Sequence, residues 1–98
     1  MTTTALKTMP YAQAKVQQTD ESIALISYET KVAIIDNEGW LTVGGLYSRT
    51  TRKHLSAFAK EYCATDYSTI KTCYEKKYKY NIYTKEFYNM NTGEVWTA

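Results

Sequence analysis

The chain has little of several residue types that usually mark a function: one proline, four glycines, two cysteines and one histidine among 98 residues. It has no run of about 18 apolar residues, so no segment is predicted to span a membrane. Its first residues, MTTTALKTMP, lack the basic and apolar regions of a secretory signal. These absences favour one domain that works in the cytoplasm and keeps its two cysteines as reduced thiols.

The scarcity of histidine and cysteine also limits the catalytic chemistry that the chain can perform. A metal site at His54 would need ligands from Cys63, Cys73 and carboxylates, and these show no recognised spacing. On a helix that begins near Thr50, His54 is typical of a packed or capping histidine, and Cys63 would lie about 13 Å further along the axis. We therefore expect a protein that is not an enzyme and that has no catalytic residue, no cofactor and no metal.

The net charge is only +2, so a charged partner must be recognised by a local patch. The densest group of cations is Arg49, Arg52 and Lys53, with His54 beside them, where a helix is predicted to begin. The backbone N–H groups at a helix start are unpaired and carry partial positive charge, which basic side chains oppose. A cation cluster at this place indicates an anionic partner, because helix starts are ready anion sites.

Hydrophobic periodicity predicts strands, then helices, then strands. Leu55, Phe58 and Tyr62 recur at helical spacing and are expected to pack on an antiparallel sheet, against Val32, Ile34, Leu41 and Val43. The predicted strands are Ile23–Ser27, Val32–Ile35, Trp40–Val43, one strand over Tyr80–Tyr88, and Glu94–Thr97; the predicted helices are Thr50–Tyr62 and Tyr67–Tyr78. The order β-β-β-α-α-β-β indicates an α+β fold with an antiparallel sheet and two helices packed on one face.

The N-terminal part is predicted differently from the rest. Residues 1–19 are rich in Thr and Gln and are interrupted by Pro10, so we expect a loosely ordered segment with a short helix over Tyr11–Gln18. Residues 20–98 are expected to form the single α+β domain.

The chain has ten tyrosines, and six of them lie between Tyr67 and Tyr88. Tyrosine presents a large rigid ring with a polar tip and is enriched where proteins bind partners. Lysines accompany these tyrosines and would also suit the negative end of a helix dipole. The expected partner-binding residues are therefore Arg49, Arg52 and Lys53 at the helix start, together with Lys76, Lys77, Tyr78, Lys79, Tyr80 and Tyr83.

Two binding classes remain open from these residues. Lysine and arginine with interleaved tyrosine supply phosphate contacts and stacking faces for nucleic acid. Ten acidic residues and a pI near 8.5 argue against a strongly basic nucleic-acid-binding domain. Tyrosine and arginine are equally suited to the centre of a protein–protein interface.

Two segments resemble a known pattern. SYETKVAI at Ser27–Ile34 and YSRTTRKHL at Tyr47–Leu55 are similar to S-Y-x-T-x-V-A followed by Y-S-x-T-T-x-K-H-[IL], which marks an uncharacterised family of small domains found largely in bacteriophage and prophage proteins. The similarity covers Ile23–Tyr62.

The resemblance implies a short accessory protein of a mobile element, located in the cytoplasm of the bacterial host. Such proteins, when compact and without catalytic groups, are often inhibitors of host defence, as anti-CRISPR proteins are. On this implication the chain is a phage-encoded inhibitor that binds a bacterial defence complex such as a Cas effector, with its guide RNA or DNA. The alternative is a small phage accessory protein that binds nucleic acid through the basic helix start and the Tyr/Lys-rich C-terminal region.

Overall fold

The computed structural model describes residues 2–9, 13–45 and 48–97. The strands are β1 (Thr2–Ala5), β2 (Ala14–Gln18), β3 (Ser22–Ser27), β4 (Thr30–Asp36), β5 (Trp40–Val43), β6 (Tyr78–Asn81), β7 (Glu86–Asn89) and β8 (Val95–Thr97). The helices are α1 (Arg49–Tyr62) and α2 (Tyr67–Lys76), and both lie between β5 and β6 in the chain.

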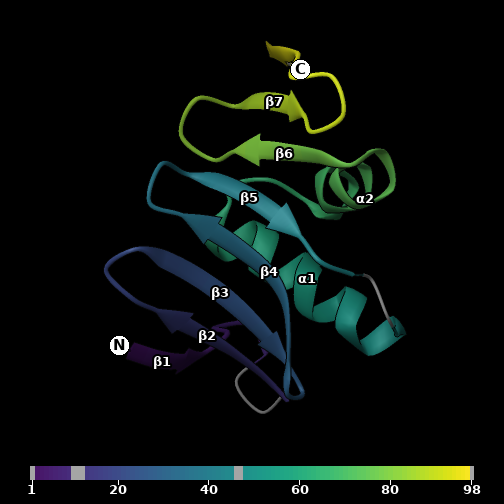
Figure 1. Cartoon of the computed structure of the whole chain (residues 1–98). Helices are drawn as coiled ribbons and strands as arrows, with labels where there is room; N and C mark the ends of the chain where they lie inside the picture. The colour runs from purple at the N-terminus through teal and green to yellow at the C-terminus, as the bar shows by residue number, and fades with distance from the viewer. Residues whose placement is uncertain (1, 10–12, 46–47, 98) are drawn as a thin grey trace.

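The strands form one antiparallel sheet whose spatial order follows the chain from β1 to β8. The chain leaves the sheet after β5, makes both helices, and returns beside β5, where Leu41 lies opposite Tyr80. The predicted α+β class with an antiparallel sheet is confirmed. Figure 1 shows both helices behind the sheet, so one sheet face is covered and the other is open.

The core lies between the covered face and the helices. Leu55 and Phe58 of α1 are fully buried, as are Val32 and Leu41 of the sheet, as the helical stripe predicted. Ile34, however, is half-buried, and Ile35 is the residue that is 1% exposed. The register of β3 and β4 shifts between Leu25 and Ile26, and such a bulge moves the following side chains to the other face.

Both helices have side-chain caps at their starts. Ser48 caps α1 by accepting a hydrogen bond from the Thr51 N–H at 3.2 Å. Asp66 caps α2 by accepting from the N–H groups of Ser68 and Thr69. Within the described ranges neither helix is long and apolar enough to cross a membrane.

The prediction for residues 1–19 is wrong in the part that the structure describes. Residues 14–18 form β2 rather than a helix, and β1 pairs with it at the edge of the sheet. The reason is a period of two: Ala14 and Val16 are 2% and 0% exposed, whereas Lys15 between them is exposed. Pro10 and Tyr11 lie outside the described residues.

The single strand predicted over Tyr80–Tyr88 is also wrong, because it is a hairpin of β6 and β7. The Asn81 carboxamide oxygen accepts hydrogen bonds from the N–H groups of Tyr83 and Thr84 at 2.9 and 3.0 Å. Lys85 then has a φ of 65°, in the left-handed region that reverses a chain. Asn81 thus ends the strand, although the alternating pattern of the sequence continues beyond it.

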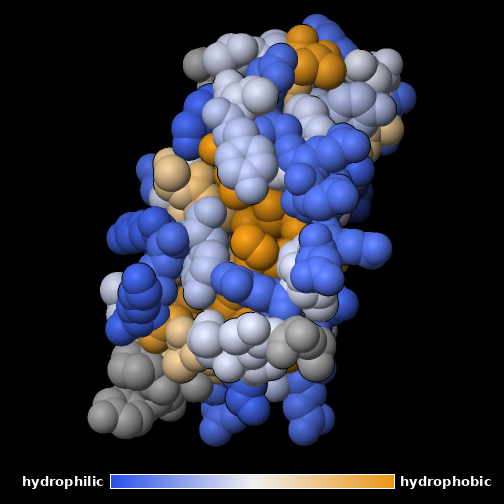
Figure 2. Space-filling model, turned by 90° about the vertical axis from the view of Figure 1, so that its left-hand side faces the viewer, coloured by the Kyte–Doolittle hydropathy of each residue, from blue (hydrophilic) through white to orange (hydrophobic). Residues whose placement is uncertain are grey.

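Figure 2 shows the side of the molecule that carries the β2–β3, β4–β5 and β6–β7 loops. Apolar side chains, in orange, occupy its middle and hydrophilic side chains surround them. Half-buried residues such as Ile23 and Ile82 pack against the core, so apolar side chains extend from the core toward the surface.

Candidate binding surface

The predicted cation cluster occupies the first turns of α1. Arg49, Arg52 and Lys53 are all exposed, and the first turn holds no acidic residue. They point away from the core because Thr51, His54, Leu55 and Phe58 form the buried side of the helix. Three cations therefore face solvent at the positive end of the helix dipole, where no acidic residue of the first turn neutralises them.

Residues of α2 extend this cluster sideways. Arg49, Arg52, Lys53, Ser56 and Tyr67 line a shallow hollow of about 250 Å³. A second hollow of about 360 Å³ is lined by Arg52, Tyr67, Lys71 and Glu75. We call Arg49, Arg52, Lys53, Ser56, Tyr67 and Lys71 together the basic helix surface.

The ion pair at this surface is weak. Lys71 and Glu75 lie 3.9 Å apart on successive turns of α2, with both side chains more than half exposed. Exposed pairs of this kind hold their charges loosely, so Lys71 can turn to meet an external anion. The basic helix surface combines cations with one half-buried tyrosine ring, and Glu75 adjoins it in the second hollow.

Beneath α1 lies a buried polar cluster that sequence reasoning missed. Ser27 Oγ is 2.8 Å from His54 Nδ1 and 3.1 Å from Thr51 Oγ1, and all three residues are at most 3% exposed. Burial lowers the pKa of His54, so the ring is neutral at pH 7. The cluster therefore ties the buried side of α1 to β3.

The predicted C-terminal residues are not brought together. Lys76 and Lys77 are exposed at the end of α2, and Lys79 lies on β6. Tyr80 is 6% exposed in the core, so its side chain cannot contact a partner while the protein is folded.

The two other tyrosines of that set lie apart from each other. Tyr78 packs edge-on against Trp96 with ring centroids 4.8 Å apart. Tyr83 is 69% exposed and lines a small hollow with Asp20, Glu21 and Asp36, at the loop side of the sheet. Tyr78, Tyr80 and Tyr83 therefore lie in three different parts of the structure and do not form one surface.

The open sheet face carries a second aromatic group, including Trp40, which was not predicted as a site residue. Trp40 and Tyr88 meet edge-to-face with centroids 6.1 Å apart. They line a hollow of about 460 Å³ together with Asp36, Glu38, Lys79 and Val95. The sequence pattern of β5 could have indicated this position. Side chains alternate between the two faces of a strand, so Trp40 lies on the face opposite to that of buried Leu41.

The arrangement of potential metal ligands and the environment of the two cysteines can be described for the part of the chain that the structure covers. No group of three or more His, Cys, Asp or Glu side chains is arranged there to hold a metal ion. Cys63 and Cys73 are free and buried, and burial raises the pKa of each thiol to about 12. Thiols of this kind are poor nucleophiles at neutral pH.

Comparison with known proteins places the chain in one family. No curated protein and no solved structure matches it significantly. A family model described as a family of unknown function (DUF8033) matches residues 1–77, from β1 to the end of α2, and so includes the basic helix surface but not β6–β8. The protein therefore belongs to this uncharacterised family, DUF8033.

Proposed function

We propose that this protein is a non-enzymatic nucleic-acid-binding protein that holds phosphates on its basic helix surface. The observation that carries the proposal is the exposure of Arg49, Arg52 and Lys53 on the first two turns of α1, with no acidic side chain in the first turn. Phosphate groups would meet these cations and the partial positive charge of the helix start together.

The distribution of charge over the molecule supports this proposal. Asp20, Glu21, Asp36 and Glu38 lie in or beside the β2–β3 and β4–β5 loops. The start of α1 lies at the other end of the strands, beside the β3–β4 turn (Figure 1). These four acidic side chains therefore lie away from the cations of α1, although Glu29 of the β3–β4 turn is on the side of the cations and Lys85 of the β6–β7 loop is on the side of the acids (Figure 1).

The side chains that could act as nucleophiles (Ser27, Cys63 and Cys73) or as a base (His54) are all buried, which supports a binding role. Ser27 and His54 are within hydrogen-bond distance of each other, but both are buried below 3% exposure. The Cys63 and Cys73 thiols are protonated at neutral pH because burial raises their pKa to about 12.

The test is fluorescence anisotropy with labelled single-stranded and duplex oligonucleotides at about 50 and 200 mM salt. Removing one phosphate-binding cation should reduce the salt slope by about 0.7 to 0.9, so the variant Arg49→Ala/Arg52→Ala/Lys53→Ala should bind at least about tenfold more weakly at the lower salt. The matched control Lys7→Ala/Lys76→Ala/Lys79→Ala removes equal charge elsewhere and should bind nearly as the wild type does. Equally weakened binding by both variants, or no binding by the wild type, would refute the proposal.

A second candidate function is the phage-type inhibitor, and the open sheet face favours it. Trp40 and Tyr88 form an aromatic pair with Val95 beside them, and Trp and Tyr are the residues most often found as interface hot spots. This inhibitor would act in the cytoplasm of the bacterial host on a defence complex, a Cas effector being the best example.

Its test is co-purification of the tagged protein from a host with an active CRISPR system, paired with a plasmid-interference assay. The inhibitor is supported if the wild-type protein retains a Cas component and blocks interference, and if Trp40→Ala loses the Cas component and no longer blocks interference. Undiminished interference with the wild-type protein expressed excludes it.

A further inference from the structure

Tyr28 has an unusual backbone conformation for a large residue. It is the first of two residues in the turn that joins β3 to β4, where Ser27 pairs with Thr30. Its φ is 59°, in the left-handed region that glycine enters without strain and an aromatic residue does not. The turn itself does not favour a tyrosine, so whatever this residue contributes lies in its ring.

The ring of Tyr28 packs against the ring of buried His54. Its centroid is 5.9 Å from that of His54, at an interplanar angle of 47°. The imidazole is held by Ser27, and the Tyr28 N–H donates to the Gln13 carbonyl at 2.7 Å. Although supported in this way, Tyr28 is 54% exposed, so part of the ring is presented to solvent.

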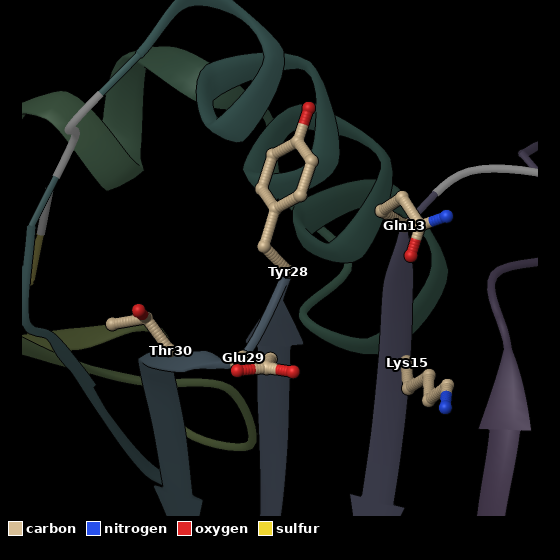
Figure 3. Close-up of a pocket in the computed structure, with 5 residues that line it drawn as sticks. All are labelled: Gln13, Lys15, Tyr28, Glu29 and Thr30. Carbon is tan, nitrogen blue, oxygen red and sulfur yellow. The ribbon is translucent and has the colours of Figure 1, made fainter.

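Tyr28 also packs on the helix that carries the basic helix surface. His54, against which it packs, directly follows Lys53 on α1, and the two side chains are about 100° apart around the helix. Figure 3 shows the Tyr28 ring standing alongside α1 with its hydroxyl directed away from the strands. Tyr28 thus lies against α1 on the side of β3, and Tyr67 lines a hollow with the cations on the side of α2.

A hollow of about 480 Å³ opens beside the ring, lined by Gln13, Lys15, Tyr28, Glu29 and Thr30 (Figure 3). Lys15 and Glu29 have opposite charges, so the hollow does not favour a phosphate. The amide, hydroxyl and charged groups offer both donors and acceptors, which suit the edge of an uncharged heterocycle.

We propose that Tyr28 stacks on an unpaired base of a single-stranded nucleic acid whose phosphates lie on the basic helix surface. This inference rests on the proposed function and names its substrate: an unpaired base presents a free face, whereas the bases of a duplex are stacked on one another. Stacking on aromatic side chains tolerates any base sequence.

The test compares Tyr28 variants in binding to an oligothymidylate and to a duplex of equal charge. Tyr28→Gly adopts the turn conformation without strain and should weaken single-strand binding about 5- to 150-fold, while leaving duplex binding unchanged. Tyr28→Phe should bind as the wild type does. Tyr28→Leu keeps an apolar cover over His54 and should be as weak as Tyr28→Gly, which separates stacking from a loss of fold.

Tyr83→Ala is the matched control, because Tyr83 is also exposed but lies among the acidic loops. It should leave single-strand affinity unchanged. If Tyr28→Gly binds single strands as well as the wild type does while the Arg49/Arg52/Lys53 variant is impaired, stacking is wrong and the proposed function stands. If the wild type binds neither nucleic acid, both are wrong.

Discussion

Exposed Tyr28 packs its ring against buried His54, with ring centroids 5.9 Å apart, although they belong to a turn of the sheet and to helix α1. The contact closes the end of the core where α1 begins. It also places the Tyr28 ring against histidine, the residue type whose charge ordinarily changes near neutral pH.

The ring of His54 is held through one of its two nitrogens. Ser27 Oγ lies 2.8 Å from His54 Nδ1 and 3.1 Å from Thr51 Oγ1, and the Ser48 hydroxyl donates to Thr51 Oγ1 at 3.2 Å. Nε2 is buried without a partner among the described residues, which costs about 1–3 kcal/mol.

We predict that acid destabilises the fold through His54. Because burial lowers its pKa in the folded state, the unfolded chain binds a proton below its ordinary value of 6.5 while the folded chain does not. The free energy of unfolding should therefore fall as the pH drops from about 7.5 through 6.5. Urea unfolding at a series of pH values measures it.

His54→Gln is the control for this pH dependence. The chain has one histidine, so the variant removes the only side chain that ordinarily titrates in this range. Its stability should be flat between about pH 5.5 and 7.5. A wild-type stability that is equally flat there would contradict the assignment.

Phe58 should be the most sensitive position of the core. It is fully buried and stacks on Tyr62 at 5.3 Å. Phe58→Ala should lower the free energy of unfolding by about 3–5 kcal/mol, because it removes buried apolar surface and leaves a cavity behind. A decrease below about 1 kcal/mol, measured by urea unfolding, would show that the helix does not pack on the sheet as described.

Glu61 should hold the β1–β2 segment against α1. Burial raises the pKa of its carboxyl, but hydrogen bonds from the Thr8 hydroxyl and from the N–H groups of Lys7 and Thr8 outweigh this and lower the pKa overall. Glu61→Gln should speed amide hydrogen exchange at Lys7 and Thr8. Glu75→Gln, which removes an exposed carboxylate, should not, and equal exchange in both variants argues against the tether.

The thiols of Cys63 and Cys73 should not react with reagents while the protein is folded. With the pKa of Cys63 and Cys73 raised to about 12 by burial, a thiol reagent at about pH 8 should label neither until the protein unfolds, and both afterwards. Mass spectrometry counts the labels. Rapid labelling of the native protein, or a stoichiometric disulfide, would contradict the burial of these residues.

Most of the fold could be predicted from local signals. The stripe of Leu55 and Phe58 and the caps Ser48 and Asp66 define both helices, because amphipathic period and capping are local properties. The β1–β2 hairpin was missed because its strands are short and polar on one side, so pairing with β3 decides their structure. Asn81 ended β6 through its own side-chain hydrogen bonds, which no alternation of hydrophobicity encodes.

The candidate site could be predicted only in part. Arg49, Arg52 and Lys53 are neighbours on one helix, so the sequence alone brings them together. Tyr67 and Lys71 join them through the packing of α2 beside α1, and Tyr28 reaches α1 through the packing of a turn on His54. Contacts between distant segments depend on the whole fold. The number of tyrosines suggested that Tyr80 is available to a partner, but its side chain is buried.

Nuclear magnetic resonance titration of the labelled protein with a short oligothymidylate at about 50 mM salt tests the central claim most directly. If the basic helix surface binds nucleic acid, backbone amide shifts should change over Arg49–Ser56 and at Tyr67, with Tyr28 and Glu29 joining them. Changes confined to Trp40, Lys79 and Tyr88 on the open sheet face, or no change at all, would contradict the account.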